Sequence, residues 1–113
     1  MNSVGKSISV ALATYNGELF LKVQLDSILQ QTLAVNEIVI VDDASSDNTV
    51  NIIKEHQRNY PFIKLIQNAS NYGPTKSFGI AVNNCLGDLI ILSDQDDIWY
   101  KNILLENNKF SGI

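Results

Sequence analysis

Cysteine is almost absent from this 113-residue chain, and its single cysteine, Cys85, excludes an internal disulfide. A lone cysteine also excludes a Cys-x-x-Cys redox pair and a zinc site built from several thiolates. Basic residues are few as well, because eight lysines and arginines stand against twelve acidic residues. The basic residues are scattered, so the chain lacks the dense positive charge that binds a phosphate backbone, and we predict no nucleic-acid partner.

Long hydrophobic runs are also missing. No apolar stretch approaches the roughly 18 residues that span a bilayer, and residues 1–6 do not form a signal-peptide pattern. We therefore expect no transmembrane segment and a cytoplasmic location. With 45% of its residues hydrophobic and 18% charged, the chain has the composition of one globular domain over residues 1–113.

The apolar residues of the chain fall into two alternating patterns. Short β-branched runs predict strands at residues 8–13, 37–41, 62–66 and 88–92, the third of them near a sheet edge. Between these runs, apolar residues recur at three- and four-residue spacing, which predicts amphipathic helices. The last of these helices is expected to carry Phe78, Ile80, Ala81, Val82 and Leu86. The order β-α-β-α-β-α-β predicts a mainly parallel sheet with helices on both faces, a Rossmann-like three-layer α/β sandwich. A further short helix is expected near residues 98–106.

Unusual polar residues cluster where the predicted strands end. Asp42 and Asp43 follow the second strand, and residues 93–97 (SDQDD) follow the fourth. Ligands of parallel α/β sheets bind outside the carboxyl ends of the strands, so both acidic segments are expected to face one ligand. Clustered carboxylates repel one another unless a cation or hydrogen-bond donors share the site, and we therefore expect a metal ion.

These segments together resemble family 2 glycosyltransferases. The resemblance covers roughly residues 7–105 and rests on ordered blocks at 9–16 (SVALATYN), 38–49 (IVIVDDASSDNT), 71–73 (NYG), 87–88 (GD) and 93–99 (SDQDDIW). Residues 76–78 and 93–99 are also similar to bacterial members often called rhamnosyltransferases. The resemblance implies a GT-A fold and the donor-binding half of an enzyme for hexosyl or deoxyhexosyl transfer in bacterial surface polysaccharide synthesis.

The resemblance also implies a divalent metal, Mg²⁺ or Mn²⁺, beside the diphosphate of the sugar donor. In the family, the last aspartate of an Asp-x-Asp motif ligates this metal and maps to Asp96, while Asp94 supports it. Asp97 is expected to act as an outer carboxylate or as a helix cap. The metal stabilises the negative charge that develops on the diphosphate as the glycosidic bond breaks.

The base-binding end of the implied donor site maps to the first two strand ends. Tyr15 resembles the aromatic residue that packs on the base, and Ala13 offers backbone contacts beside it. Asp43 matches the carboxylate that accepts a hydrogen bond from the N3–H of uracil or thymine, which favours a UDP- or dTDP-sugar. Asp42 is expected to be structural, because neighbouring strand residues point in opposite directions.

The segment before the third predicted helix completes the expected site. Gly73 permits close approach of the backbone, and Lys76 is placed to reach the diphosphate from the start of the helix. Many family members carry Ala-Arg-Asn where this chain has residues 77–79 (SFG). No arginine role is therefore carried over.

Several of these residues also have plainer interpretations. An Asp-Asp pair after a strand often serves a turn and the following N-cap. Tyr15 is compatible with an ordinary turn aromatic, and Lys76 with a solvated helix residue. Trp99 is interpreted as a packing residue. His56 is interpreted as a solvated side chain on the polar side of its helix.

No general base is assigned within the chain. Inverting enzymes of this fold take the base from a second half, which also binds the acceptor, here expected to be a saccharide or a lipid-linked saccharide. We interpret the chain as part of a longer enzyme, cytoplasmic or peripheral at the inner membrane face, whose exposed sheet edge favours self-association or a partner chain. A non-catalytic nucleotide-sugar-binding module is the alternative. A phosphoacceptor receiver domain is disfavoured, because its acidic pair follows the first strand, where this chain has residues 13–16 (ATYN).

Overall fold

The structure is a computed structural model that describes residues 6–31 and 34–94. The helix expected near residues 98–106 and the roles given to Asp96, Asp97 and Trp99 lie outside the described residues. The described residues form alternating strands and helices: β1 (Ile8–Thr14), α1 (Leu21–Leu29), β2 (Glu37–Asp42), α2 (Thr49–Asn59), β3 (Ile63–Gln67), α3 (Pro74–Asn83) and β4 (Leu89–Ser93). None of these helices is long and apolar enough to cross a membrane.

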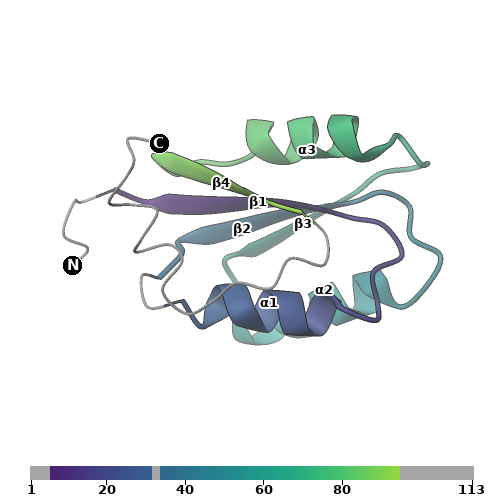
Figure 1. Cartoon of the computed structure of the whole chain (residues 1–113), viewed down its shortest axis with the longest axis horizontal. Coiled ribbons are helices and arrows are strands. Elements are labelled where there is room, and N and C mark those ends of the chain that lie inside the picture. Colours follow the sequence, from purple (N-terminus) through teal and green to yellow (C-terminus); the bar gives the residue numbers. More distant parts are fainter. Residues whose placement is uncertain (1–5, 32–33, 95–113) are drawn as a thin grey trace.

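The four strands form one parallel sheet in the order β3-β2-β1-β4 (Figure 1). β1 and β2 lie in the centre, and every one of their residues is buried, as is typical of parallel strands covered on both faces. The strand order reverses beside β1, because α1 and α2 lead outward to β3 whereas α3 leads back across the sheet to β4. A reversal of this kind is where parallel sheets bind ligands.

Helices cover both faces of the sheet, with α3 on one side and α1 and α2 on the other (Figure 1). The larger core lies between the sheet and the pair α1 and α2, and its buried residues include Leu12, Leu21, Leu25, Ile28, Ile40 and Ile53. The smaller core lies under α3 and consists of Ala11, Val39, Val41 and Ala81. The predicted Rossmann-like three-layer α/β sandwich is therefore confirmed.

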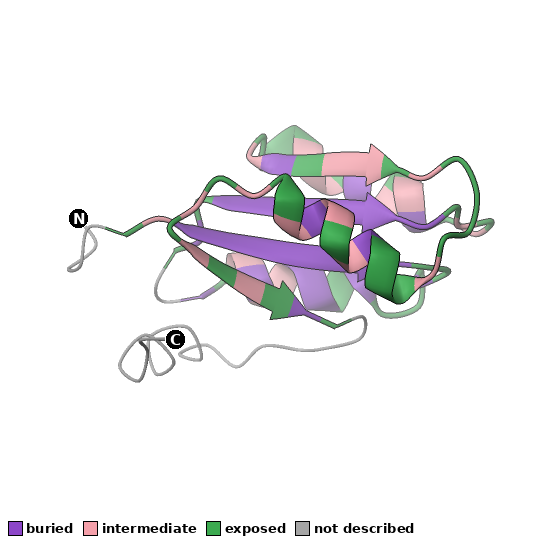
Figure 2. Cartoon of the chain, turned by 90° about the horizontal axis from the view of Figure 1, so that it is seen from above, coloured by how far each residue is buried: buried purple, intermediate pink, exposed green. Residues whose placement is uncertain are grey.

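β3 and β4 are the edge strands of the sheet, and Figure 2 shows buried and more exposed residues mixed along them. In β4 the two faces differ, because Leu89 and Ile91 pack against the larger core whereas Ile90 and Leu92 are exposed. The edge position expected for the strand near residues 62–66 is confirmed. Self-association through a sheet edge stays a prediction.

The end of α3 differs from the expected helix. The helix stops at Asn83, and Leu86, which was expected within it, is exposed. The backbone N–H of Leu86 donates to Glu37 Oε2, and the N–H of Gly87 donates to Ser9 Oγ at 2.8 Å. These bonds lead the chain into β4. A Cβ on Gly87 would lie 2.5 Å from Ser9 Oγ, so only glycine fits this close approach.

The expectation that His56 is solvated is wrong. Its Nε2 lies 3.0 Å from Asp26 Oδ1 on α1, its Nδ1 lies 2.9 Å from the Ile52 carbonyl oxygen, and its side chain is only 10% exposed. Lys22 Nζ also donates to Asp26, at 2.8 Å. Burial by itself raises the pKa of Asp26, but the hydrogen bonds from Lys22 and His56 outweigh it and lower that pKa. The contact joins α1 to α2.

Candidate functional site

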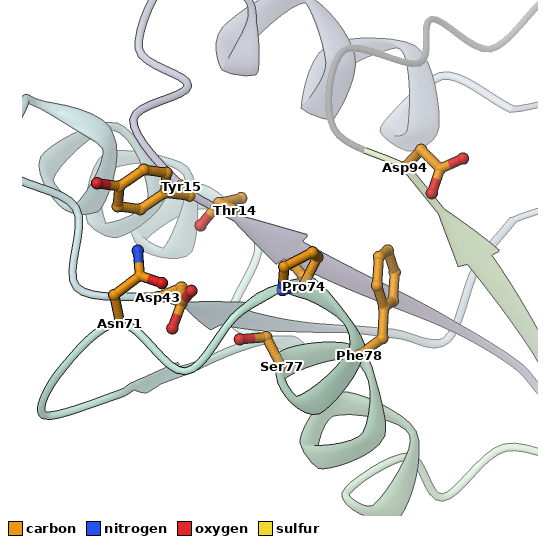
Figure 3. Close-up of a pocket in the computed structure, with 9 residues that line it drawn as sticks. Thr14, Tyr15, Asp43, Asn71, Pro74, Ser77, Phe78 and Asp94 are labelled. Atoms are coloured by element: carbon orange, nitrogen blue, oxygen red, sulfur yellow. The ribbon is translucent and has the colours of Figure 1, made fainter.

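A pocket of about 370 Å³ opens at the carboxyl ends of β1, β2 and β4, beside the first turn of α3 (Figure 3). Its lining consists of Ala13, Thr14, Tyr15, Asp43, Asn71, Pro74, Ser77, Phe78 and Asp94. The pocket therefore lies at the edge where parallel α/β sheets bind ligands. Of the residues predicted from the sequence, the structure brings Ala13, Tyr15, Asp43 and Asp94 together at this pocket.

Asp43 is a buried carboxylate of the pocket, with 4% of its surface exposed. Its Oδ1 accepts hydrogen bonds from the Tyr72 backbone N–H at 2.6 Å and from Asn68 Nδ2 at 2.9 Å, and its Oδ2 accepts from the Gly73 N–H at 2.9 Å. Burial by itself raises the pKa of Asp43, but these bonds and Ser77 outweigh it and hold that pKa below its ordinary value. Asp43 is therefore ionised at neutral pH and acts only as an acceptor.

Asp42 belongs to a separate hydrogen-bond network. Its Oδ1 accepts from Thr14 Oγ1 at 2.8 Å and from Ser45 Oγ at 2.6 Å, and its Oδ2 accepts from the Ser45 N–H at 2.9 Å. The turn that these bonds close contains Ala44 at φ 62, in the left-handed region that non-glycine residues rarely adopt. These contacts are those expected of a structural carboxylate.

The loops that follow β1 and β2 are tied to each other. The Asn16 N–H donates to Ser45 Oγ, and Asn16 Oδ1 accepts from the Ser46 N–H, both at 2.9 Å. These bonds brace the loop that carries Tyr15. Ser45 and Ser46 therefore join two loops, whereas Asp47 Oδ1 accepts from the Thr49 N–H at 3.0 Å at the start of α2.

Tyr15 and Asp94 lie on opposite sides of the pocket, with Pro74 and Phe78 between them in Figure 3. Tyr15 lies on the same side of the pocket as Asp43, and 47% of the Tyr15 surface is exposed, so this aromatic residue is partly accessible. Asp94 directly follows β4 and is exposed. The pocket thus offers an aromatic ring and an ionised carboxylate at one end and a second carboxylate at the other.

Gly73 and Lys76 are not part of the pocket lining. Gly73 has φ 94, a conformation suited to glycine, and this conformation directs its N–H to Asp43. Lys76 Nζ lies 4.9 Å from the centre of the Tyr72 ring, in a cation–π contact. The structure therefore places the side chain of Lys76, in the first turn of α3, against Tyr72 of the preceding loop.

Sequence reasoning missed five of the lining residues: Thr14, Asn71, Pro74, Ser77 and Phe78. Pro74, Ser77 and Phe78 have helical spacing, because positions i, i+3 and i+4 at the start of α3 share one face. That spacing was a usable signal, given that the helix begins at a strand-end loop. Asn68 was also missed, and its Nδ2 bridges Asp43 and Ser77 Oγ at 2.9 and 3.0 Å.

Asp94 is the carboxylate at the second end of the pocket that could contribute to holding a cation. Within residues 6–31 and 34–94, no group of three or more His, Cys, Asp or Glu side chains is placed to bind a metal ion. Mg²⁺ is commonly held by one or two carboxylates, with water and substrate phosphates completing its shell. A single carboxylate therefore fits a metal that arrives with a phosphorylated ligand.

The fold and the pocket define the class of the protein, a Rossmann-like α/β domain with a ligand pocket at the carboxyl edge of its parallel sheet. The sequence profile of Glycosyl transferase family 2 matches residues 9–107. The chain belongs to this family.

Named relatives agree with the family and with the GT-A fold. The chain is 42% identical over 98 residues to the dTDP-rhamnosyl transferase RfbG of Shigella flexneri. This alignment covers 80% of the chain and 33% of RfbG. Residues 1–349 of S. aureus TarS, in complex with UDP, superpose with a TM-score of 0.82 at 32% identity, covering 92% of this chain and 31% of that TarS chain. The mannosyltransferase PcManGT from Pyrobaculum calidifontis, in complex with GDP-Man and Mn²⁺, gives 0.78 at 25% identity, covering 90% and 31%. The chain spans about a third of the length of RfbG, of the TarS 1–349 chain and of PcManGT, and 19% of the longer TarS chain.

Proposed function

We propose that this chain binds a nucleotide-diphosphate sugar, UDP- or dTDP-linked, together with a divalent metal, as the donor-binding half of a bacterial glycosyltransferase for surface polysaccharide synthesis. The observation that carries the proposal is the arrangement of the pocket. An exposed aromatic ring and an ionised carboxylate stand at one end, and a second carboxylate stands at the other. Membership of the family and the UDP bound by TarS support this reading.

The base of the donor is proposed to bind at the Tyr15 end. The exposed ring of Tyr15 offers a stacking surface, and the backbone of Ala13 lies beside it in the lining. Because ionised Asp43 only accepts hydrogen bonds, it favours a base that presents an N–H, such as the N3–H of uracil or thymine. Asp43 already accepts bonds from Tyr72, Gly73 and its other protein donors, so the base shares or replaces one of them.

The diphosphate is proposed to lie at the Asp94 end, with Asp96 as the metal ligand and Asp94 in support. A divalent metal, Mg²⁺ or Mn²⁺, supplies positive charge that stabilises the departing diphosphate without a proton transfer. Gly73 borders the pocket through its bond to Asp43 and permits close approach of the ligand. The long side chain of Lys76 is proposed to leave the aromatic ring it contacts and reach the phosphates.

The complete reaction is proposed to need more than this chain. The chain spans about a third of the length of RfbG, and we assign no general base within it. The acceptor, a saccharide or a lipid-linked saccharide, and the base that deprotonates its hydroxyl are therefore proposed to belong to a longer protein. We propose a cytoplasmic location for that protein, including the inner face of the membrane.

Calorimetric titration of UDP and of ADP, with and without Mn²⁺, tests the donor site. Mn²⁺ should strengthen UDP binding, because the metal bridges the carboxylates and the diphosphate, and Asp96→Asn should remove that gain. Asp43→Ala should weaken UDP binding more than ADP binding, because adenine has no ring N–H. The control is Asp88→Asn, which alters a carboxylate at the amino end of β4, away from the pocket. It should change neither nucleotide binding nor the effect of Mn²⁺.

Two results would reject these assignments. UDP binding that changes neither with Mn²⁺ nor in Asp96→Asn would reject the metal site. Equal losses of UDP and ADP binding in Asp43→Ala would reject base recognition. A longer form of the gene product should also consume activated sugars in the presence of an acceptor. If it binds the donor but transfers nothing, the non-catalytic binding module becomes the better description.

A further inference from the structure

Gln24 is a fully buried amide on α1 that does not line the pocket. Its Nε2 donates to Ser93 Oγ at 3.1 Å and to the backbone oxygen of Asp94 at 2.5 Å. Ser93 is the last residue of β4, and Asp94 is the first residue after it. Helix α1 therefore holds the chain at the point where β4 ends and the acidic segment begins.

Packing alone does not require an amide at this position. The buried neighbours of Gln24 on α1 are Leu21, Leu25 and Ile28, so the helix face is otherwise apolar. An apolar side chain of similar size would fill the same space without the cost of burying polar atoms. The two hydrogen bonds to the end of β4 are therefore the distinctive feature of this residue.

The end of β4 is also a place where the sheet gives little support. β4 is an edge strand that pairs with β1 alone, and the register between these strands ends at the pair Leu12 and Ser93. Because the ladder stops there, the backbone at Asp94 depends on contacts from outside the sheet. The Gln24 amide supplies one of them.

We propose that Gln24 is a positioning residue for the donor site, because it fixes the backbone at Asp94 and so sets where the Asp94 carboxylate lies in the pocket. This role rests on the proposed function, since the carboxylate is aligned toward a metal–diphosphate ligand. A purely structural amide would affect only the stability of the domain. A positioning amide also affects how strongly the metal contributes to nucleotide binding.

The test compares two buried glutamines in the intact chain. Gln24→Met removes the donors and keeps the side-chain size, whereas Gln31→Met alters an amide whose Nε2 donates to the Ser27 carbonyl oxygen, within the same segment, at 3.1 Å. At saturating UDP, Gln24→Met should weaken the apparent Mn²⁺ affinity about tenfold, as residues that orient metal ligands do. UDP affinity without metal should stay unchanged, and Gln31→Met should change neither quantity.

The outcomes separate this role from the proposed function. If wild-type UDP binding does not respond to Mn²⁺, the proposed function fails and the role of Gln24 fails with it. If the wild type responds, an equal response in Gln24→Met, or equal losses in both methionine variants, overturns the positioning role and leaves the proposed function standing.

A second variant covers a failure to fold. Gln24→Glu keeps the side-chain size but places a carboxylate against the Asp94 carbonyl oxygen, and it should weaken Mn²⁺ affinity at least as much as Gln24→Met. If both Gln24 variants are unfolded while Gln31→Met is folded, the amide is needed for the fold, and the positioning role is overturned.

Discussion

Replacing Asp43 by asparagine should destabilise the domain as well as the pocket. The carboxylate accepts hydrogen bonds from the backbone N–H groups of Tyr72 and Gly73 and from the Asn68 amide. An asparagine side chain has one acceptor oxygen, and its amino group would face groups that are themselves donors. At least one of these donors therefore loses its acceptor.

The magnitude follows from the number of bonds and their exposure. A hydrogen bond to a charged group contributes about 1.5–3 kcal/mol, and a buried donor without an acceptor costs about 1–3 kcal/mol. Tyr72 is 42% exposed, so water replaces part of what is lost in the loop. We therefore expect Asp43→Asn to lower the free energy of unfolding by about 2 kcal/mol, which corresponds to a fall of roughly 8 °C in Tm.

Urea unfolding followed by circular dichroism measures this loss. Because the folded pKa of Asp43 lies below its ordinary value of 3.8, its contribution is present above that value and is lost as the pH falls through the folded pKa. Wild type and variant should differ at pH 7 and converge in strong acid. Asp88→Asn, at an exposed carboxylate that accepts from the Ser7 N–H at 3.1 Å, should cost under about 0.5 kcal/mol. Equal losses in the two variants would refute this reasoning.

Two further predictions concern the amino ends of the strands, away from the pocket. Gly87→Ala should lower the free energy of unfolding by about 1–3 kcal/mol, measured by thermal unfolding, because the new Cβ would lie 2.5 Å from Ser9 Oγ. The control is Gly79→Ala, whose Cβ meets nothing within 4 Å and which should be neutral or stabilising. A larger loss of stability in Gly79→Ala than in Gly87→Ala would contradict the packing. Burial by itself raises the pKa of Glu37, but hydrogen bonds from a backbone N–H, Lys64 and Ser9 outweigh it and lower that pKa. Wild type should therefore be more stable than Glu37→Gln above the ordinary pKa of 4.5, and this difference should vanish as the pH falls through the pKa of Glu37 in the folded protein. A difference that persists in strong acid would exclude a stabilising role of the Glu37 charge.

The strands and helices were predictable because their signals are local. The runs that became β1 and β2 are apolar at almost every position, which is typical of strands buried on both faces, and the observed strands each extend one residue beyond the predicted ends. The end of α3 was less predictable. Leu86 fits the apolar spacing of the helix, but Glu37 and Ser9 bind the N–H groups at residues 86 and 87 and end the helix earlier.

The candidate site was predictable in part. Asp43, Tyr15 and Asp94 follow strands, and parallel strands necessarily bring such residues to one edge. Lys76 was placed in the site by its position at a helix start, but the structure pairs it with the Tyr72 ring. Its location depends on a loop conformation that includes a positive φ at Gly73, which the residue pattern near a single glycine does not specify.

The sequence by itself determined the order of the elements, the layered α/β architecture and the edge of the sheet where the pocket lies, because hydrophobic period and turn residues act over a few neighbouring positions. The tertiary structure decided which polar groups meet. His56 contacts Asp26 from 30 positions away, and Gln24 contacts Ser93 from 69 positions away. A hydrogen bond needs its donor and acceptor within about 3 Å, and only the packing of helices against the sheet brings such distant residues that close.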